Sequence, residues 1–453
     1  MKLRCTLVAL ALVACDAKRE PAPRPVAAPL ATKLHHGLAW YEDELEQARV
    51  SAARTNKLLF VDLWAGWCHT CLSMREYVLT RETLAESSHR LVFVALDTEK
   101  ATNAEALRSL PIGAWPTFYL LDGNGRIYGR WVGAGSPAQM ERFARDGLRA
   151  FDADKALPPN DPLTRLVAGD RAVAQNQLAA ARMAYEGALA RSSTEWPRRA
   201  DAWASLLGVL RKLGDSAACA DAGLRGLEET GSSSSATDFS YWALDCARAL
   251  TKTDPRVGVL RRRISSRLLT LCELGDEALS PDDRGDACGL MHTVSEDLGD
   301  AATARRAYEL RLNVLTAAAA GKPDEIAKTY DFARAETLVG LGRGEQALKL
   351  LEARERALPD DYNPPHQLAR TYRELGKWDE GLAAIDRALK LAVHDAPRRA
   401  AMLGVRAELL AGVGREPEVR AALEEQLAAY RALPEGQRQP QREQSVAAKL
   451  ANL

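Results

Sequence analysis

Residues 58–71, with the sequence LLFVDLWAGWCHTC, decide the fold class of the N-terminal part of the chain. The run Leu58–Trp64 is short and apolar, which favours a buried β-strand. Cys68 and Cys71 follow it as a Cys-x-x-Cys pair, and a helical pattern then extends to about Ser87. This spacing is typical of a redox-active dithiol or of half a zinc site. Because no second Cys or His pair stands at ligand spacing, we predict no metal site.

Regular elements are also predicted on both sides of this stretch. The sequence Asp122-Gly123-Asn124-Gly125 is a strong turn signal, so the runs flanking it form a predicted hairpin. The predicted order is α-β-α-β-α-β-β-α. Besides the strand and helix above, it comprises helices over Leu38–Arg54, Thr102–Leu110 and Pro137–Phe151 and strands over Leu91–Leu96, Thr117–Leu121 and Arg126–Val132.

This order, with Cys-x-x-Cys after the first strand, resembles the thioredoxin fold over roughly residues 50–151. Asp62 stands six residues before Cys68, where thioredoxins keep a buried acid. Further matching features are the approach Trp64-Ala65 and Trp67, the cis-proline loop Trp115-Pro116-Thr117, and Val132-Gly133 before the last helix. The resemblance predicts an α/β thioredoxin fold for residues 37–153.

The resemblance implies dithiol chemistry. Cys68 is expected to be a reachable thiolate at the start of a helix, where unpaired backbone N–H groups and the helix dipole stabilise an anion. A protonated His69 would add positive charge beside it. Cys71, one turn further on, would resolve the mixed disulfide. Asp62 would accept the proton, although it is also compatible with a plain strand residue facing a polar loop.

The same resemblance assigns substrate binding to three residues. A cis bond before Pro116 would turn the backbone of Trp115 toward Cys68, so that an extended substrate could pair with it as an added strand. Trp67 and Trp115 would supply flat apolar walls. The alternatives are a trans proline at a strand start and tryptophans that serve packing only.

Two features differ from thioredoxin itself. The dipeptide between the cysteines is His69-Thr70, and no proline interrupts Leu72–Tyr77, for which we expect a straight helix. Both features resemble the periplasmic C-terminal domain of thiol:disulfide interchange reductases. Protein disulfide isomerases and the strong periplasmic oxidase carry their His next to the second cysteine instead. The sequence therefore favours a reductase or isomerase over an oxidase.

The N-terminus has the layout of a bacterial export signal. Lys2 and Arg4 precede the short apolar run Thr6–Val13, which is too short for a membrane span. Residues 12–15, Leu-Val-Ala-Cys, resemble a lipobox, in which Cys15 is acylated; an ordinary signal peptide is the alternative. We predict a signal peptide over 1–15, a Pro/Ala-rich tether over 16–36, and a membrane-anchored lipoprotein of the bacterial periplasm or cell envelope, on either membrane.

The remainder, residues 160–453, is predicted to be all helical. Gly342 and Gly376 stand 34 residues apart within matching patterns of small and large apolar residues, a spacing that resembles the tetratricopeptide repeat. About seven copies are expected, located at Thr164–Ser192, Trp203–Gly214, Tyr241–Leu271, Leu298–Tyr308, Tyr330–Pro359, Pro364–Pro397 and Leu403–Gly414. A generic helical solenoid is the alternative. Such arrays usually bind polypeptides; a scaffold or capping role is the alternative.

Four cysteines fall within the predicted array. In repeat register, Cys219 and Cys246 lie on helix faces that normally touch, and Cys272 and Cys288 flank a passage between helices. We predict the disulfides Cys219–Cys246 and Cys272–Cys288, with four small buried thiols as the alternative.

Composition narrows the function classes. The 453 residues include 61 basic and 61 acidic side chains, so the chain lacks the cationic excess of a nucleic-acid binder. No apolar run reaches the ~20 residues of a membrane span. We therefore expect an extracytoplasmic thiol-disulfide oxidoreductase that needs no cofactor, exchanges electrons with a dithiol donor protein and acts on disulfide-containing proteins. The alternative is a protein-binding scaffold with a redox-sensing or inert thioredoxin-like module.

Overall fold

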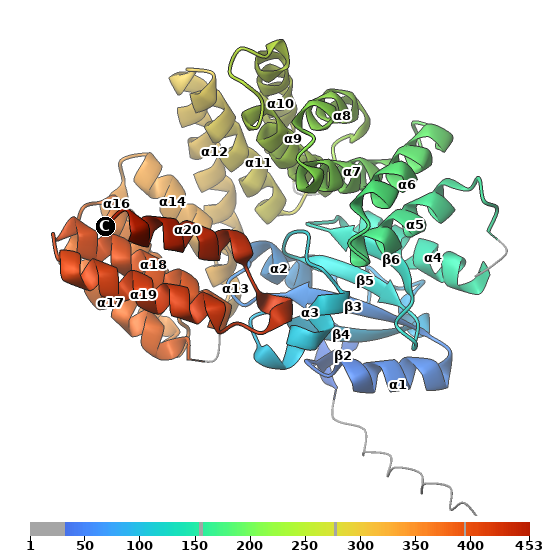
Figure 1. Cartoon of the computed structure of the whole chain (residues 1–453), viewed down its shortest axis with the longest axis horizontal. Helices are drawn as coiled ribbons and strands as arrows, with labels where there is room; N and C mark the ends of the chain where they lie inside the picture. Colours follow the sequence, from blue (N-terminus) through green and yellow to red (C-terminus); the bar gives the residue numbers. More distant parts are fainter. Residues whose placement is uncertain (1–31, 154–156, 276–278, 394–395) are drawn as a thin grey trace, which may run out of the picture. The chain divides into compact units, whose positions relative to one another are not determined.

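The computed structural model describes residues 32–153, 157–275, 279–393 and 396–453. These residues belong to one compact unit, Thr32–Leu453 (Figure 1). The predicted signal peptide, the predicted lipidation site Cys15 and most of the predicted tether lie outside them. No helix in the described ranges is both long and apolar enough to cross a membrane.

A six-stranded mixed sheet forms the N-terminal part. Its order is β1-β2-β4-β3-β5-β6; β4 runs parallel to both β2 and β3, whereas β5 is antiparallel to β3 and to β6. The strands are β1 Lys33–His35, β2 Leu38–Glu42, β3 Leu58–Trp64, β4 Leu91–Asp97, β5 Thr117–Leu121 and β6 Ile127–Val132. The four predicted strands, with the predicted hairpin, are confirmed.

Helices cover both faces of this sheet, which explains why β3 is apolar throughout. Side chains alternate between the faces: Leu59 and Val61 pack with α1, while Leu58 and Phe60 pack with the side chains that follow the cysteine pair and with α4. The helical segments here are α1 Leu45–Thr55, α2 His69–Ser73, the π-helix Met74–Val78, α3 Ala104–Ser109, α4 Pro137–Ala153 and the 3₁₀ turns Ser88–Arg90 and Ala101–Asn103.

The helix predicted over Leu38–Arg54 is wrong in its first part. Residues 38–42 form β2, and β1 lies inside the range predicted as tether. Leu38 and Trp40 are buried while Ala39 is exposed, which is the alternation of a strand. Trp40 packs against Phe93, with ring centroids 5.0 Å apart. The hairpin of β1 and β2 therefore extends the sheet. The sequence did not reveal it because residues 38–54 together resemble one amphipathic helix.

The helix predicted to run straight from the cysteine pair to Ser87 is also wrong. After Ser73 it continues as a π-helix that ends at Val78. The backbone N–H of Arg81 then bonds to the carbonyl of His36 at 2.9 Å. Because this N–H group is bonded to the N-terminal hairpin, it cannot form a helical hydrogen bond. The chain therefore leaves the helical path before Arg81.

The C-terminal part is the predicted tetratricopeptide-like solenoid. Within the described residues its main helices form seven antiparallel pairs, followed by α20, in agreement with the repeat count (Figure 1). The helices are α5 Pro162–Ala174, α6 Leu178–Arg191, α7 Arg199–Leu213, α8 Ser216–Glu229, α9 Ser234–Arg248, α10 Pro255–Glu273, α11 Pro281–Asp297, α12 Ala301–Ala319, α13 Asp324–Ala327, α14 Asp331–Gly340, α15 Gly344–Ala357, α16 Asn363–Glu374, α17 Trp378–Leu391, α18 Ala396–Gly412, α19 Glu416–Arg431 and α20 Pro440–Ala451, with 3₁₀ turns at Lys328–Tyr330 and Glu435–Gln437.

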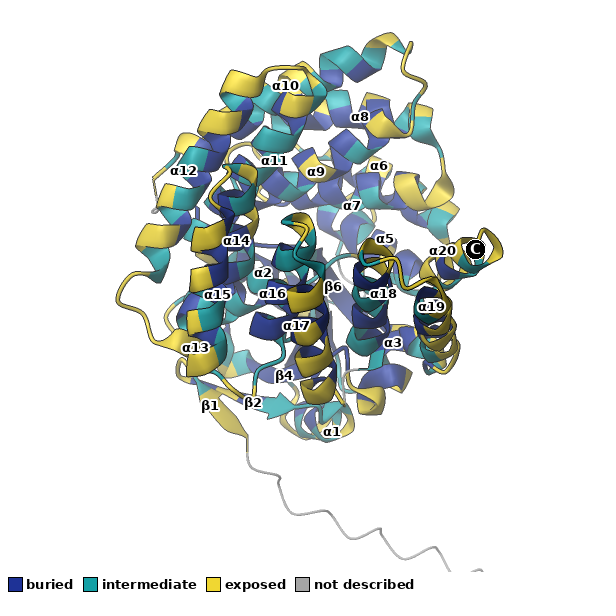
Figure 2. Ribbon diagram, turned by 90° about the vertical axis from the view of Figure 1, so that its left-hand side faces the viewer, coloured by how far each residue is buried: buried dark blue, intermediate teal, exposed yellow. Residues whose placement is uncertain are grey.

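The repeat pattern has a simple physical basis. Helices such as α17 and α19 bury one side against their neighbours and expose the other (Figure 2). Gly342 and Gly376 link the helices of their pairs with φ of 73° and 70°, a left-handed conformation that glycine adopts without strain. Small residues at the contacts let the helices approach and bury a continuous core.

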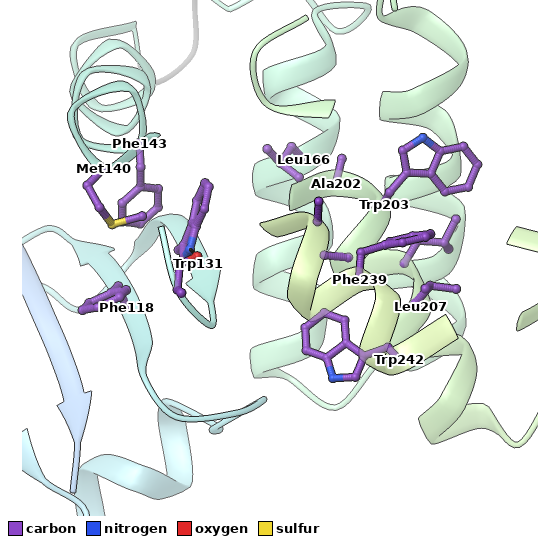
Figure 3. Packing of buried hydrophobic residues seen from close by; sticks show 14 of the residues in the cluster. Phe118, Trp131, Met140, Phe143, Leu166, Ala202, Trp203, Leu207, Phe239 and Trp242 are labelled. Atoms are coloured by element: carbon purple, nitrogen blue, oxygen red, sulfur yellow. Dashed lines mark hydrogen bonds between the residues drawn. The ribbon is translucent and has the colours of Figure 1, made fainter. Parts of the chain in front are cut away.

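The two parts share one hydrophobic core. Phe118, Trp131 and Phe143 of the α/β part belong to the same buried cluster as Leu166 and Ala202 of the first repeats (Figure 3). Polar contacts reinforce the junction: Asp170 accepts a 2.9 Å hydrogen bond from the backbone N–H of Arg130. The first repeats are therefore fused to the sheet domain.

The four solenoid cysteines form two disulfides. Cys219 joins Cys246 between α8 and α9, and Cys272 joins Cys288 between α10 and α11. These are the pairs expected from the repeat register, and each ties a helix to its successor.

Candidate functional site

The candidate active site is the loop between β3 and α2. Cys68 and Cys71 are joined there by a disulfide, so the structure represents the oxidised form. Cys68 is the N-cap residue of α2, and its sulfur accepts a hydrogen bond of 3.0 Å from the backbone N–H of Cys71. A backbone donor aimed at this sulfur would also stabilise a thiolate once the pair is reduced.

Both sulfur-bearing residues are buried, which corrects the expectation of a reachable Cys68. Cys68 is 4% exposed and Cys71 is 1% exposed. They lie in a small cluster with Ala65, and the rings of Trp67 and Trp115 pack against it. These walls were expected from the sequence, whereas the cover supplied by the solenoid was not.

Asp62 lies on the face of the sheet that α2 covers. It shares this face of β3 with Leu58 and Phe60, and those two pack with side chains of the segment after the cysteines. Both of its carboxyl oxygens are buried and lack a hydrogen-bond partner among the described residues. Burial raises the pKa of Asp62 to about 7, against the opposing charge of Arg75. A carboxyl group with this pKa can exchange a proton near neutral pH.

The loop before β5 supplies the opposite wall. The Trp115–Pro116 peptide bond is cis, as the resemblance implied. Trp115 donates its indole N–H to the hydroxyl of Thr98 at 2.9 Å. Its ring meets that of Trp67 edge to face, with centroids 5.1 Å apart. The structure thus brings Trp67, Trp115 and the cysteine pair together.

Residues of the solenoid cover this loop. The side-chain amide of Asn363 donates to the carbonyl of Gly66 at 3.3 Å, and the hydroxyl of Tyr362 lies beside the same glycine. The guanidinium carbon of Arg398 lies 4.8 Å from the ring centroid of Trp67. These contacts come from α16, the turn before it, and α18. They explain why a cysteine at the start of a helix is nevertheless buried.

His69 also faces the solenoid. Its Nδ1 lies 2.9 Å from Oδ1 of Asp282 on α11, and its ring stacks on Phe332 of α14 at 6.3 Å. Burial lowers the pKa of His69, but the nearby carboxylates of Asp282 and Asp286 raise it, with a net result of about 10. His69 is therefore an imidazolium at neutral pH whose charge is largely balanced by the solenoid.

The donor atoms of His69, Asp282 and Asp286 lie within 4.8 Å of one another, close enough to hold a cation. The imidazolium already supplies positive charge at this place. Arg311 supplies more, since its guanidinium lies 3.9 Å from Asp286. The arrangement is thus explained as an ion-pair cluster.

No sequence signal pointed to the solenoid residues of the site. Asp282, Asn363 and Arg398 lie more than 200 residues from the cysteines and belong to no motif. Their repeats follow an ordinary helical pattern, and only the way the solenoid folds back brings these side chains to the Cys-x-x-Cys loop.

The ion pair makes a prediction about His69. Asp282→Asn removes its closest carboxylate, so the pKa of His69 should fall from about 10 toward the ordinary value of a histidine. An NMR titration of the His69 ring proton measures this directly. Glu296→Gln, which alters an exposed carboxylate next to His292 instead, should leave the His69 titration unchanged. An unaltered His69 pKa in the Asp282→Asn protein would contradict the assigned contact.

Comparison with known proteins agrees with the fold of the N-terminal α/β part. Residues 45–148 match a family model described as a thioredoxin-like domain. This segment contains β3, the cysteine pair, the Trp115–Pro116 loop and most of α4. It is a thioredoxin-like domain, and its close cysteine pair fits a thiol-disulfide oxidoreductase. No curated protein matches the sequence.

Solved structures with helical repeats show a distant likeness. The apo form of RapI is 12% identical, with 66% of this chain and 83% of that chain covered and a TM-score of 0.38. The assembly chaperone of RpL4, Acl4, is 14% identical over 64% and 97%, with a TM-score of 0.31. In the APC/C hetero-tetramer Cut9-Hcn1 the identity is 13% over 56% of this chain and only 45% of that chain, with a TM-score of 0.32. At these scores the likeness supports no inference about function.

Proposed function

We propose that the protein catalyses thiol-disulfide exchange with protein substrates through Cys68 and Cys71. The observation that carries the proposal is the disulfide between them, with the sulfur of Cys68 at the start of α2 and within 3.0 Å of a backbone N–H. This environment favours a thiolate, which is the attacking species in exchange.

The steps follow from the chemistry of the pair. In the reduced protein, the Cys68 thiolate attacks a substrate disulfide, and one substrate sulfur leaves as a thiolate. Cys71 then loses its proton, attacks the mixed disulfide and releases the second substrate sulfur. Asp62, buried under α2, accepts that proton. Two electrons pass to the substrate, and a dithiol protein returns the Cys68–Cys71 disulfide to the reduced state. No cofactor takes part.

Access to the pair requires movement. Because Cys68 is only 4% exposed, a substrate disulfide reaches it only after the contacts over Gly66 and Trp67 open. Those contacts include the hydrogen bond from Asn363, the Tyr362 hydroxyl beside Gly66 and the stacking of Arg398. Individual contacts of this kind contribute about 1 kcal/mol each, so local opening is energetically accessible.

The setting proposed for this reaction is the bacterial periplasm or cell envelope, with the protein anchored through lipid on Cys15. Three disulfides in the described residues support an oxidising compartment. A reductase or isomerase is proposed over an oxidase because His69 follows the first cysteine. The positive charge of His69 is balanced by Asp282 and therefore adds little stabilisation to a Cys68 thiolate. Strong oxidants, in contrast, have a strongly stabilised thiolate.

An insulin-reduction assay on the full-length protein, with dithiothreitol as electron source, tests the proposal. We expect catalysis above the dithiothreitol background, and its complete loss in Cys68→Ser. The matched control is Cys219→Ser with Cys246→Ser, which removes the disulfide between α8 and α9 and should keep most of the activity. Equal rates for the wild type and Cys68→Ser would exclude the proposed reaction.

A redox-sensing or inert module attached to a binding scaffold is the second candidate. The burial of both sulfurs favours it, because a covered disulfide can serve to hold the loop against the solenoid. On this account the insulin assay shows no catalysis. Cys68→Ser would then leave the cellular phenotype intact, while deletion of the repeats would abolish it.

A further inference from the structure

Three cavities form a row that ends at the Cys-x-x-Cys loop. The first, of about 320 Å³, is lined by side chains of α16, α18, α19 and α20. The second, of about 310 Å³, shares Arg370 with the first. The third, of only about 20 Å³, shares Phe332 and Gln367 with the second, and Trp67 and His69 complete its walls. Shared lining residues therefore relate the cavity among the last repeats to the small one at the candidate active site.

The first cavity, hereafter the basic cavity, is strongly cationic. Its charged lining comprises five cationic side chains and one carboxylate, namely Arg370, Arg373, Arg398, Arg442, Lys449 and Glu408. A concave site lined by one sign of charge attracts and concentrates ligands of the opposite sign. The chain as a whole carries no net charge, so this excess is local.

The few carboxylates nearby are already engaged. Glu408 pairs with Arg373 and lies 3.5 Å from Lys449. The carboxylates that attract Arg370, namely Glu336, Glu374 and Glu408, form their close ion pairs with other cations, and Glu99 attracts Arg398.

Arg398 has one polar atom without a partner in the part of the chain that the structure describes. Its Nε is buried and lacks a hydrogen-bond partner among the described residues, and its Nη2 donates to the buried, neutral His366 at 3.2 Å. Burial lowers the pKa of both Arg370 and Arg398; Tyr362 and Glu99 act against this shift at Arg398, whereas Arg370 and Arg442 add repulsion. Burying guanidinium groups next to one another with few counter-charges is costly, and an anionic ligand in the cavity reduces that cost.

Arg398 also connects the basic cavity to the Cys-x-x-Cys loop, since its guanidinium stacks on Trp67. Trp67 packs in turn against Cys68 and Cys71. An anion that draws Arg398 into the basic cavity weakens the contact that covers the cysteines. Binding there and access to Cys68 are thus physically coupled.

We propose that the basic cavity binds an acidic segment of the protein substrate and so presents a neighbouring disulfide to Cys68. A polypeptide is favoured over a small anion because the cationic side chains are spread over three helices, α16, α18 and α20, rather than gathered at one point. Carboxylates of Asp and Glu match the bidentate geometry of arginine. The inference rests on the proposed exchange reaction and names the substrate class for it.

Fluorescence anisotropy with the full-length protein tests the inference. The probes are two labelled peptides without cysteine, equal in sequence except that one carries glutamates where the other carries glutamines. We expect the glutamate peptide to bind at least about tenfold more tightly, and its affinity to fall with added salt. Equal affinity for the two peptides would overturn the inference, as would calorimetric binding of pyrophosphate without binding of the glutamate peptide.

Arginine variants locate the site. Arg370→Gln and Arg442→Gln, made separately, should each weaken binding of the glutamate peptide by about tenfold or more. Arg420→Gln removes the same charge from an exposed position on α19 outside the cavity and should change the affinity less than twofold. Similar losses in all three variants would show a non-specific charge effect and overturn the inference.

Failure of the inference is distinguishable from failure of the proposed reaction. In the Cys68→Ser, Cys71→Ser protein, peptide binding should persist although exchange is impossible. Insulin reduction by the wild type without selective binding of the glutamate peptide rejects the basic cavity alone. Selective binding without any exchange activity rejects the reaction and leaves an acidic-peptide site on the solenoid.

Discussion

Cys71→Ser is expected to convert the protein into a covalent trap for its substrates. Cys68 can still attack a substrate disulfide, but serine cannot cleave the resulting mixed disulfide, because a hydroxyl is far less acidic than a thiol. Turnover should fall to the dithiothreitol background while an adduct accumulates. Reduced Cys71→Ser protein, mixed with a disulfide-containing peptide, should give a species on non-reducing gels whose mass equals protein plus peptide.

The geometry of the pair makes the assignment of roles testable. Cys68 caps α2, whereas Cys71 lies within the helix and contributes the backbone N–H to the Cys68 sulfur. The reciprocal variant Cys68→Ser should therefore form no adduct under the same conditions. Adducts in equal yield from the two variants would contradict the order in which the cysteines act. Absence of adduct from Cys71→Ser would contradict exchange through Cys68.

Asp62→Asn is expected to change both the pH dependence of stability and the rate of exchange. Burial raises the pKa of Asp62 in the folded protein from 3.8 to about 7. The folded state therefore holds this proton more tightly than the unfolded state does. The stability that Asp62 contributes is full below pH ~4 and is lost as the pH rises through ~7. Asparagine does not titrate, so this loss should disappear in the variant.

The size of the effect follows from the pKa shift. Between pH 4 and pH 8, the wild type should lose about 4 kcal/mol more of its unfolding free energy than Asp62→Asn. Urea unfolding across this pH range measures the difference. Asp360→Asn, which alters an exposed carboxylate on the solenoid, should follow the wild-type profile. If the unfolding free energies of the wild type and Asp62→Asn change in parallel with pH, the conclusion that Asp62 is buried without a partner is contradicted.

The same variant tests the catalytic role of Asp62. If its carboxylate accepts the proton of Cys71, Asp62→Asn should slow the resolving step about 100-fold and leave formation of the mixed disulfide nearly unchanged. Stopped-flow measurement of the two phases separates the steps. Equal slowing of both phases would instead point to a change in the position of α2.

The strands of the sheet and the helix pairs of the solenoid were predictable because their sequence patterns are local. In β3 the run of apolar residues identifies a strand covered on both faces, and Gly342 with Gly376 marks the repeat length. Two segments misled this reasoning. Residues 38–42 have a weak pattern that packing against Phe93 resolves, and the helix after Cys71 ends where a backbone donor is used by the N-terminal hairpin.

The amino-acid order alone determined which side chains carry the chemistry, since Cys68, Cys71, Asp62 and Trp115-Pro116 stand at spacings that the sheet domain converts into proximity. Only the tertiary structure decided how those groups are used. The solenoid, fused to the sheet through a shared core, places Asp282 against His69 and Arg398 over Trp67, and thereby balances the one charge and covers the sulfurs. Contacts between residues hundreds of positions apart depend on the accumulated angles of many helix pairs, which no short stretch of sequence encodes.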